Sequence, residues 1–354
     1  MMSVHDMMQL VFQVNASDLH LVVGAPPVIR VDGVLSPIEG EAVLMPDRAQ
    51  ELIYGILTDR QRELLIANKE VDYSYQFSEV GRFRVNAYYQ RLTLAAALRL
   101  IPTKVPTLEE LRIPGNIRQF TNLRQGFILV TGPTGHGKST TLAALIEIIN
   151  QERADHIVTI EDPLEFLFQS KQSVISQREL HGDTHSWQVA LRSALREDPN
   201  VVMVGEMRDY ETIAAALSVA ETGHLVFSTL HTNSAAQTID RIIDVFPEHQ
   251  QAQVRLQLSN TLEAVVSMRL IPAKSGGRIP AVEILLATPA VRNIIRVGKT
   301  HQIDNVIQTS GEIGMMSMEA CLAYWTKAGE LDLTTAQQYS LRPEEVARLV
   351  KGSP

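Results

Sequence analysis

The stretch GFILVTGPTGHGKSTTL, residues 126–142, decides how this chain folds. An apolar run from Phe127 to Val130 predicts a buried strand, and apolar residues from Leu142 onward recur at helical spacing. Between them, the segment from Gly132 to Ser139 fits the pattern G-x-x-x-x-G-K-[ST]. A chance match to so short a pattern is the alternative. The strand before it and the helix after it are the context that the pattern requires.

Each residue type in this loop suits a phosphate group. Glycines let successive backbone N–H groups point inward, and the helix start adds partial positive charge. Lys138 would neutralise the terminal phosphates of ATP, and the Ser139 hydroxyl would bind Mg²⁺. We expect His136 to contribute through its backbone and to face solvent. The predicted nucleotide-binding residues are Gly132, Pro133, Thr134, Gly135, His136, Gly137, Lys138, Ser139 and Thr140.

The composition is that of an ordinary globular protein of 354 residues, with 45% hydrophobic and 20% charged residues. A net charge of −8 argues against nucleic acid as the main partner. The single Cys321 excludes an internal disulfide and a cysteine-rich zinc site. No apolar run approaches the length of a transmembrane helix, and the first residues lack the layout of a secretory signal. We therefore expect a cytoplasmic protein.

The pattern of elements predicts two domains of different class. In residues 1–101, helices over 46–57 and 59–67 and strands over 71–75, 81–90 and 94–100 indicate a small α+β domain. Three prolines between 102 and 123 indicate a linker. Residues 124–354 predict an α/β domain with a helical C-terminal region. Its strands are expected at 127–131, 156–161, 173–176, 201–205 and 225–229, and its helices near 139–150, 186–196, 210–221 and 234–244. Residues 247–354 are expected to add helices and one short strand pair around 268–271 and 278–285.

Because strand and helix alternate, we expect a largely parallel sheet whose strands end at one edge. One predicted strand ends in Glu161, Asp162 and Glu165, which could bind Mg²⁺ through water or polarise an attacking water. Capping of a helix before Pro163 is the alternative. The next strand is followed by Glu206, placed where phosphate-loop proteins carry a metal-orienting acid, although a solvated loop residue would look the same.

A third strand has His224 before it and His231 after it. An isolated histidine is usually packed or capped, but two histidines with Thr and Asn flanking a buried strand suggest a sensor of the γ-phosphate. His231 is the favoured residue for this role, and His224 stays an open alternative. In the first domain, Arg82 and Arg84 share one face of a strand, and Arg99 follows fifteen positions after Arg84. Such arginines could stabilise charge on a transferred phosphoryl group, or could form a solvated basic face.

Four motifs in this order resemble the secretion-type AAA-like motor ATPases, and among them the retraction ATPases of type IV pili. The matching segments are 132–140, 159–165, 204–209 and 222–233, with further matches at 17–21, 81–84 and 290–299. This resemblance implies a RecA-like ATPase domain, a PAS-like first domain and a homo-hexamer. It also implies a cytoplasmic location, peripheral at the inner-membrane pilus machine, where the motor would act on a membrane platform protein.

By the same resemblance, Arg84 and Arg99 reach the phosphates at a neighbour's site, and Glu165 activates water. Glu161 is not separated from Glu165 in that role. Ser139 and Glu206 would hold Mg²⁺. One departure is His136, which replaces the serine usual in this loop; we expect binding to survive it. The tetracysteine module of the extension ATPases is absent from this sequence.

Three other functions compete with an ATP-driven retraction motor. One is a paralogous accessory retraction ATPase, which would otherwise be a partner. Another is a nucleotide-sensing ring subunit with little turnover, against which the intact Lys138, Glu165 and Glu206 argue. The third is a DNA-packaging or conjugative ATPase, which the acidic balance disfavours.

Overall fold

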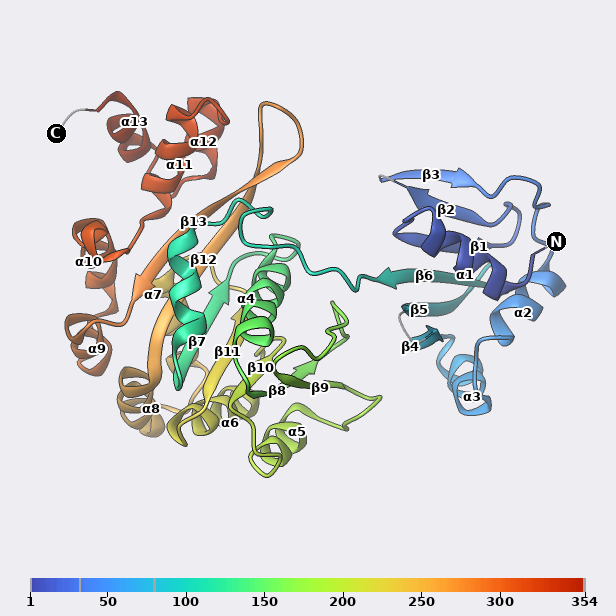
Figure 1. Cartoon of the computed structure of the whole chain (residues 1–354), viewed down its shortest axis with the longest axis horizontal. Helices are drawn as coiled ribbons and strands as arrows, with labels where there is room; N and C mark the ends of the chain where they lie inside the picture. The colour runs from blue at the N-terminus through green and yellow to red at the C-terminus, as the bar shows by residue number, and fades with distance from the viewer. Residues whose placement is uncertain (1, 32, 79–80, 353–354) are drawn as a thin grey trace. The chain divides into compact units, whose positions relative to one another are not determined.

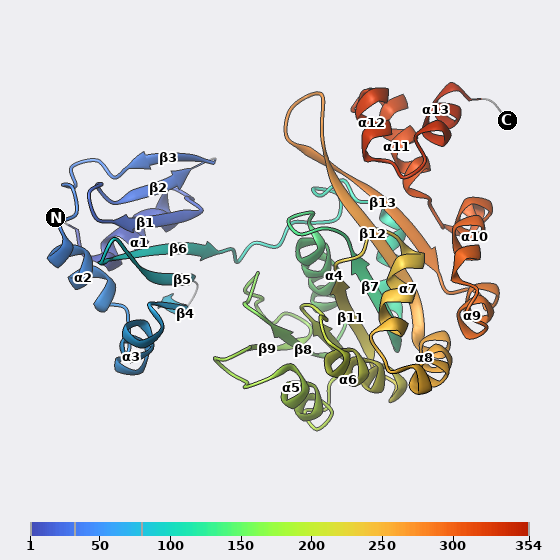
Figure 2. The same cartoon turned by 180° about the vertical axis from the view of Figure 1, so that it is seen from behind.

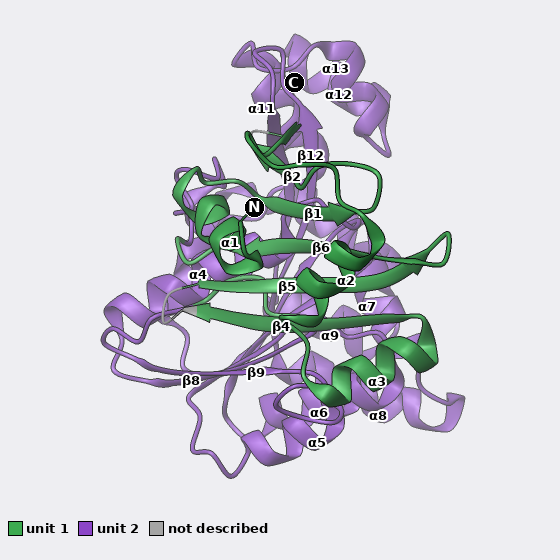
Figure 3. Cartoon of the chain, turned by 90° about the vertical axis from the view of Figure 1, so that its right-hand side faces the viewer, with its two compact units in different colours: residues 1–104, 163–167 green, residues 105–162, 168–354 purple. Residues whose placement is uncertain are grey.

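The computed structural model describes residues 2–31, 33–78 and 81–352, and divides the chain into two compact units (Figures 1 and 2). The first unit contains residues 1–104 and 163–167, and the second contains residues 105–162 and 168–354 (Figure 3). Within the segment predicted as a linker, Leu108, Ile113, Ile117 and Phe120 are buried in the core of the second unit. The domain bounds drawn from the sequence stay a prediction.

The described residues of the first unit form an antiparallel sheet in the order β3-β2-β1-β6-β5-β4, together with three helices. Its core gathers the apolar sides of β1, β5 and β6 with those of α1, α2 and α3. The helices and strands predicted between 46 and 100 are confirmed. The elements are α1 (Val4–Gln13), β1 (Asp18–Val22), β2 (Val28–Val31), β3 (Val34–Pro37), α2 (Pro46–Tyr54), α3 (Asp59–Asn68), β4 (Glu70–Ser78), β5 (Gly81–Gln90) and β6 (Thr93–Ile101).

The second unit is built on a seven-stranded sheet in the order β13-β12-β7-β11-β10-β8-β9. Neighbouring strands from β12 to β9 are parallel, and only β13 is antiparallel to its neighbour. This confirms the predicted parallel sheet and the five predicted strands. The strands are β7 (Gly126–Thr131), β8 (His156–Glu161), β9 (Val174–Glu179), β10 (Val201–Val204), β11 (Leu225–Leu230), β12 (Leu262–Pro272) and β13 (Arg278–Leu286).

Helices cover both faces of this sheet, so its central strands are buried on both sides. Along β7, Phe127 and Leu129 join one core, whereas Ile128 and Val130 join the other. One core includes η1, α4 and α11 to α13, and the other includes α5 to α10. Their bounds are η1 (Gly115–Asn122), α4 (Lys138–Glu152), α5 (Trp187–Ala194), α6 (Tyr210–Glu221), α7 (Ala235–Asp244), α8 (Glu248–Thr261), α9 (Pro289–Arg296), η2 (Thr300–Gln302), α10 (Ile303–Thr309), η3 (Gly311–Ile313), α11 (Met318–Lys327), α12 (Leu333–Tyr339) and α13 (Pro343–Lys351).

The region after residue 247 differs from the sequence-based expectation in one strand. A short strand pair was expected around 268–271 and 278–285, but β12 has 11 residues and lies parallel to β7. Its start follows the last residue of α8 directly, with no glycine or proline between the two elements to mark the change of period. Among the described residues, no helix combines the length and apolar character needed to cross a bilayer.

The backbone of the phosphate loop lies directly against β12. Gly132 has a φ of 147°, and a Cβ added to it would lie 2.3 Å from the carbonyl oxygen of Met268. This clash would be with backbone, and backbone packed inside a sheet cannot move aside as the end of a flexible side chain can. Glycine is therefore required at this position by the packing of the loop on the sheet, as well as by its backbone conformation.

The packing at Gly132 predicts a severe effect of Gly132→Ala. We expect its free energy of unfolding to fall by about 3 kcal/mol or more, because strain and a backbone clash act together, and we expect ATP binding to be lost. Gly276→Ala is the matched control, since Gly276 has a φ of 91° with no atom near the added Cβ. That variant should lose about 1 kcal/mol. Urea unfolding measures both, and equal losses would contradict the packing argument.

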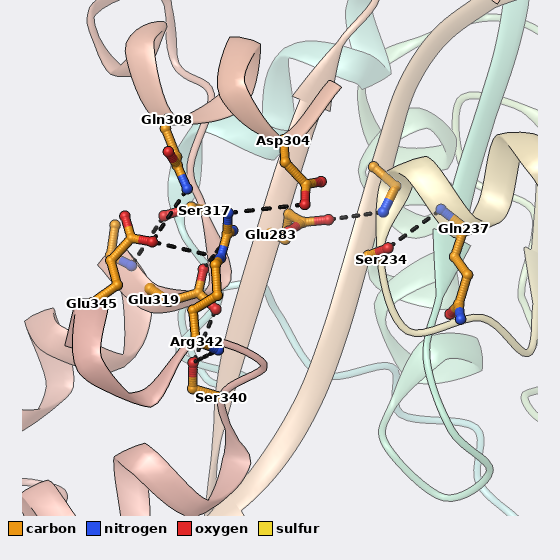
Figure 4. Close-up of polar contacts among 12 residues, drawn as sticks. Ser234, Gln237, Glu283, Asp304, Gln308, Ser317, Glu319, Ser340, Arg342 and Glu345 are labelled. Carbon is orange, nitrogen blue, oxygen red and sulfur yellow. Dashed lines mark hydrogen bonds and ion pairs between the residues drawn. The ribbon is translucent and has the colours of Figure 1, made fainter. Parts of the chain in front are cut away.

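Glu283 on β13 is a carboxyl group buried inside the second unit (Figure 4). Its Oε1 accepts a hydrogen bond of 2.8 Å from the backbone N–H of Ala235. Burial raises the pKa of Glu283 to about 7, and the neighbouring Asp304 and Glu319 act in the same direction. The Ala235 N–H and the Arg342 guanidinium oppose this rise. The carboxyl group therefore titrates near neutral pH.

This raised pKa predicts a stability that depends on pH. The folded unit binds the Glu283 proton more tightly than the unfolded chain does, so the bound proton stabilises the fold. This stabilisation is fully present below pH 4.5 and is lost as the pH rises through about 7. Glu283→Gln should therefore stabilise the unit more at pH 8 than at pH 5, by roughly 2 kcal/mol. Urea unfolding by tryptophan fluorescence measures this, because both tryptophans, Trp187 and Trp325, belong to the second unit. A pH-independent difference would contradict the assignment.

Candidate nucleotide-binding site

The predicted phosphate loop joins the carboxyl end of β7 to the start of α4. Gly137 precedes the helix with a φ of 87°, so the chain turns into α4 at Lys138 through a conformation that favours glycine. Ser139 and Thr140 lie in the first turn of α4, where backbone N–H groups lack partners within the helix. The nine predicted loop residues therefore form one continuous turn onto a helix N-terminus.

The Lys138 ammonium is held inside its own loop. Its Nζ donates to the carbonyl oxygens of Gly132 and Pro133, each at 2.9 Å, and the residue is only 7% exposed. Its Nζ also lies 3.5 Å from Nδ1 of His231. The charge is thereby fixed over the loop, and the carbonyl contacts compensate part of the cost of its burial.

His231 links the loop to Glu206. It directly follows β11, and its Nδ1 lies 3.3 Å from the Thr134 hydroxyl as well as close to Lys138. Its Nε2 lies 3.2 Å from Oε2 of Glu206. Because an ammonium can only donate, Nδ1 of the neutral ring accepts, and the hydrogen on Nε2 is donated to Glu206. Three predicted site residues are thus connected.

Glu206 follows β10 and is engaged on both of its carboxylate oxygens. His231 contacts Oε2, and Nη2 of Arg208 lies 2.5 Å from Oε1. Arg208 was not predicted as a site residue. It stands two positions after Glu206, which is a usable local signal. The Arg208 side chain is 73% exposed and therefore reaches water, whereas the Glu206 side chain is only 17% exposed.

The carboxylates after β8 have different surroundings. Glu161 is 4% exposed, and its Oε1 accepts hydrogen bonds from the Thr159 hydroxyl at 2.7 Å and from the Gln177 amide at 3.4 Å. Asp162 and Glu165 are exposed. Glu165 belongs to residues 163–167, which are grouped with the first unit, so the structure does not place it relative to the loop. The contact from Thr159 could have been predicted, since residues two apart on a strand share a face.

His136 does not face solvent as the sequence analysis expected. Its side chain is half-buried, and Nδ1 accepts a hydrogen bond of 2.9 Å from the backbone N–H of Leu270 on β12. Nη1 of Arg278 on β13 donates to the carbonyl oxygen of Gly135 at 3.2 Å. Burial lowers the pKa of His136, and Arg278, Lys138 and Arg269 lower it further. The ring is therefore a neutral acceptor that fastens the loop to β12.

His224 lies at the amino end of β11, away from the loop. Its Nδ1 contacts the Thr222 hydroxyl at 3.0 Å and the Val219 carbonyl oxygen at 3.1 Å. A strand of 6 residues separates it from the carboxyl edge where His231 lies. Its contacts are those of a residue that completes the end of α6 and not those of a nucleotide sensor.

Arg84 and Arg99 lie opposite each other on β5 and β6 of the first unit. Arg84 forms a bidentate ion pair with Asp72, at 2.7 and 3.2 Å, and Nε of Arg99 lies 3.0 Å from Asp18. Burial opposes ionisation of Asp18, but hydrogen bonds from Ser17 and Arg99 outweigh it and hold the pKa of its carboxyl below the usual value. Two guanidinium groups are thus presented side by side on one face of the sheet.

The residues present fit ATP with Mg²⁺. The loop combines an ammonium, a helix N-terminus and glycines at positive φ, which together suit a polyphosphate. Within the described part of the chain, no group of three or more His, Cys, Asp or Glu side chains could hold a metal ion by itself. Mg²⁺ would therefore depend on the Ser139 hydroxyl, the Glu206 carboxylate and phosphate oxygens, which is how it usually binds beside nucleotides.

Comparisons with known proteins give a consistent result. Residues 2–318 match the family described as type II/IV secretion system protein. The chain is 48% identical over 335 residues to the type IV pilus retractation ATPase PilT of Pseudomonas aeruginosa, covering 93% of this chain and 96% of that protein. It is 36% identical over 351 residues to the type IV pilus ATPase PilU of the same organism, covering 99% and 92%.

A solved structure of the pilus retraction motor PilT with bound ADP superposes with a TM-score of 0.91 at 44% identity. The match covers 98% of this chain and 100% of that one. These findings confirm the predicted α/β fold class, with a RecA-like domain and a smaller α+β domain, as well as the resemblance drawn from the motifs. The chain belongs to the type II/IV secretion system protein family.

Proposed function

We propose that this chain is the ATP-hydrolysing motor subunit that retracts type IV pili and so drives twitching motility. The observation that carries the proposal is the connected set of Lys138, His231 and Glu206 beside the phosphate loop. It joins the group that would bind phosphate to the acid that would hold Mg²⁺. The greater identity to PilT than to PilU favours the main motor over the accessory ATPase.

Within this proposal, each side chain has a definite task. Lys138 and the loop N–H groups bind the β- and γ-phosphates, and Ser139 and Glu206 hold Mg²⁺, which would supply charge neutralisation at the phosphates. His231 responds to the γ-phosphate, because its Nδ1 lies beside Lys138 and Thr134. When the γ-phosphate leaves, the ring is free to shift against Glu206. Phosphate loss is thereby transmitted to β11 and α7.

Glu165 is our candidate for the base that activates water, and Glu161 for its support. The Glu161 carboxylate is buried and fixed by Thr159 and Gln177, which suits a positioning role at the end of β8. Glu165 is exposed, so it can accept a proton from water when the site closes.

Arg84 and Arg99 would complete the site of a neighbouring subunit in a homo-hexamer. Arg84 and its partner Asp72 are both nearly half exposed, and an exposed pair of this kind is worth about 0–1 kcal/mol. A γ-phosphate that develops charge can therefore take Arg84 from Asp72 at small cost. Arg99 is 70% exposed but is held by a more deeply buried carboxylate, so its transfer to a phosphate costs more than that of Arg84.

The proposed motor works at the cytoplasmic face of the inner membrane, on a platform protein at the pilus base. In this proposal, a paralogous retraction ATPase of the PilU kind is a second partner. Nucleic acid is not part of the proposal, because the chain has a net charge of −8.

The test of this function uses a strain lacking the chain. We expect cells that keep their pili and lose twitching, and we expect wild-type but not Glu206→Ala protein to restore it. Purified Glu206→Ala should bind ATP nearly as tightly as wild type while turnover falls by about 10³-fold, because this acid acts mainly in the transition state. Lys138→Ala is the control for lost binding. Bald cells would indicate assembly, and equal loss of binding and turnover would make Glu206 structural.

A second prediction concerns the proposed arginine donated between subunits. In rings that mix wild-type and Arg84→Ala subunits, ATP turnover should fall below the wild-type fraction, since each variant subunit also disables its neighbour's site. Asp72→Ala is the matched control, because it removes the ion pair and leaves the arginine. The measurement is ATP turnover as a function of the fraction of wild-type subunits in the mixture. Activity strictly proportional to wild-type content would exclude a role across the interface.

A further inference from the structure

The carboxyl group of Glu283 is attached to the segment that carries His231. Its acceptor bond goes to the backbone N–H of Ala235, the first residue of α7. Ala235 follows His231 by four positions, through a turn capped by Ser234. Among the described residues, none of the proposed nucleotide site forms a hydrogen bond with Glu283. Its effect on that site must therefore pass through the start of α7.

The same segment is fixed from its other side by buried hydroxyl groups. The Thr232 hydroxyl lies 2.7 Å from that of Thr238, which in turn lies 3.4 Å from Thr131. Thr131 ends β7 immediately before Gly132, and its hydroxyl lies 2.9 Å from that of Ser267 on β12. The turn after His231 is thus held between the base of the phosphate loop and Glu283. Both sets of contacts therefore act on the residues that directly follow His231.

A glutamate is a costly choice for this contact. An amide side chain could accept the same N–H bond without a buried negative charge, and would leave the unit more stable at neutral pH. What the carboxylate adds is a stronger, charge-assisted bond, made at the positive end of a helix of 10 residues. The negative charge therefore strengthens the hydrogen bond to the first residue of α7, but it lowers the free energy of unfolding of the second unit.

We propose that Glu283 is a positioning residue of the nucleotide site, whose ionised carboxylate holds the first turn of α7 and thereby keeps the His231 ring against Glu206. The proposal rests on the role assigned above to His231. It adds to that role a control of turnover by protonation, at a group that touches neither nucleotide nor metal.

The C-terminal region supplies the charges around Glu283 (Figure 4). Asp304 comes from α10, Glu319 from α11, and Arg342 from the turn before α13. Nη2 of Arg342 lies 2.9 Å from Oε2 of Glu319, and Nη1 lies 3.8 Å from Oδ2 of Asp304. The two acids favour the protonated form of Glu283, and Arg342 favours the ionised form. The C-terminal helices therefore set the pH at which α7 is held most firmly.

This arrangement predicts that kcat for ATP hydrolysis decreases as the pH falls below about 7. We call this decrease the acid limb of the pH profile. As the pH falls through about 7, Glu283 gains a proton and the hold on α7 weakens. ATP binding depends on the phosphate loop, so KM should change little. We expect kcat to fall about fivefold, which corresponds to the difference of about 1 kcal/mol in strength between a charge-assisted hydrogen bond and a neutral one.

The first experiment measures kcat and KM for ATP hydrolysis by full-length wild-type and Glu283→Gln protein from pH 5.5 to 9. The variant should keep the wild-type KM, lose the acid limb near pH 7 and stay at the low-pH value of kcat. A variant profile that matches wild type overturns the inference. Absence of turnover by wild type would instead overturn the proposed ATPase function, so the two failures are distinguishable.

A second variant separates Glu283 from other groups that titrate in this range. Asp304→Asn removes a negative charge near Glu283, so the midpoint of the acid limb should move to lower pH. Asp59→Asn makes the same change of charge on the exposed start of α3 in the first unit, and should leave the midpoint in place. A limb that arises at His231 or elsewhere would be unmoved by Asp304→Asn, and that result also overturns the inference.

Discussion

The close approach of Gly132 to the carbonyl oxygen of Met268 is the constraint on which the site depends. It places the backbone of the loop directly on β12, and further contacts from the same hairpin reinforce this placement. Leu270 donates to the His136 ring, and Arg278 donates to the carbonyl oxygen of Gly135. The loop is thus held by the sheet, and a bound phosphate need not order it. Such preorganisation lowers the cost of binding and fixes where Lys138 presents its charge.

The parts of the site that the sequence could predict are those that follow from parallel strands. Residues placed directly after β10 and β11 reach the same edge as the loop, which is why Glu206 and His231 could be assigned to it from their positions alone. The contacts from β12 and β13 could not be predicted in this way. They join His136 to a strand more than 130 positions later in the sequence, and no local sequence pattern predicts such a hydrogen bond.

The pairing of Arg84 with Arg99 illustrates a different limit. The two are symmetric about the turn at Arg91 and Leu92, so a tight hairpin would place them opposite each other. This turn, however, has a φ of 48° at Arg91 and 64° at Leu92, where glycine or asparagine is usual. Without that signal, the strand pattern alone did not place the two arginines opposite each other. Glu283 was missed for a similar reason, since one acid in an apolar strand says nothing of what it contacts.

The cations of the proposed site are all held by protein oxygens before any phosphate arrives, and the strength of each contact decides which can exchange. Arg84 and Asp72 are both nearly half exposed, and an ion pair of this kind costs about 0–1 kcal/mol to break. Arg208 is 73% exposed, but the Glu206 side chain that it contacts is only 17% exposed, so this contact costs more to exchange. Lys138 is bound by carbonyl oxygens of the loop that already points it toward the phosphates, so it needs no large movement. Exchange at Arg208 has one further consequence. It removes the Arg208 contact to Glu206 and leaves the contact from His231. In our proposal, Glu283 helps to set the position of α7 and thereby that of His231. The orientation of the Glu206 carboxylate then depends on α7.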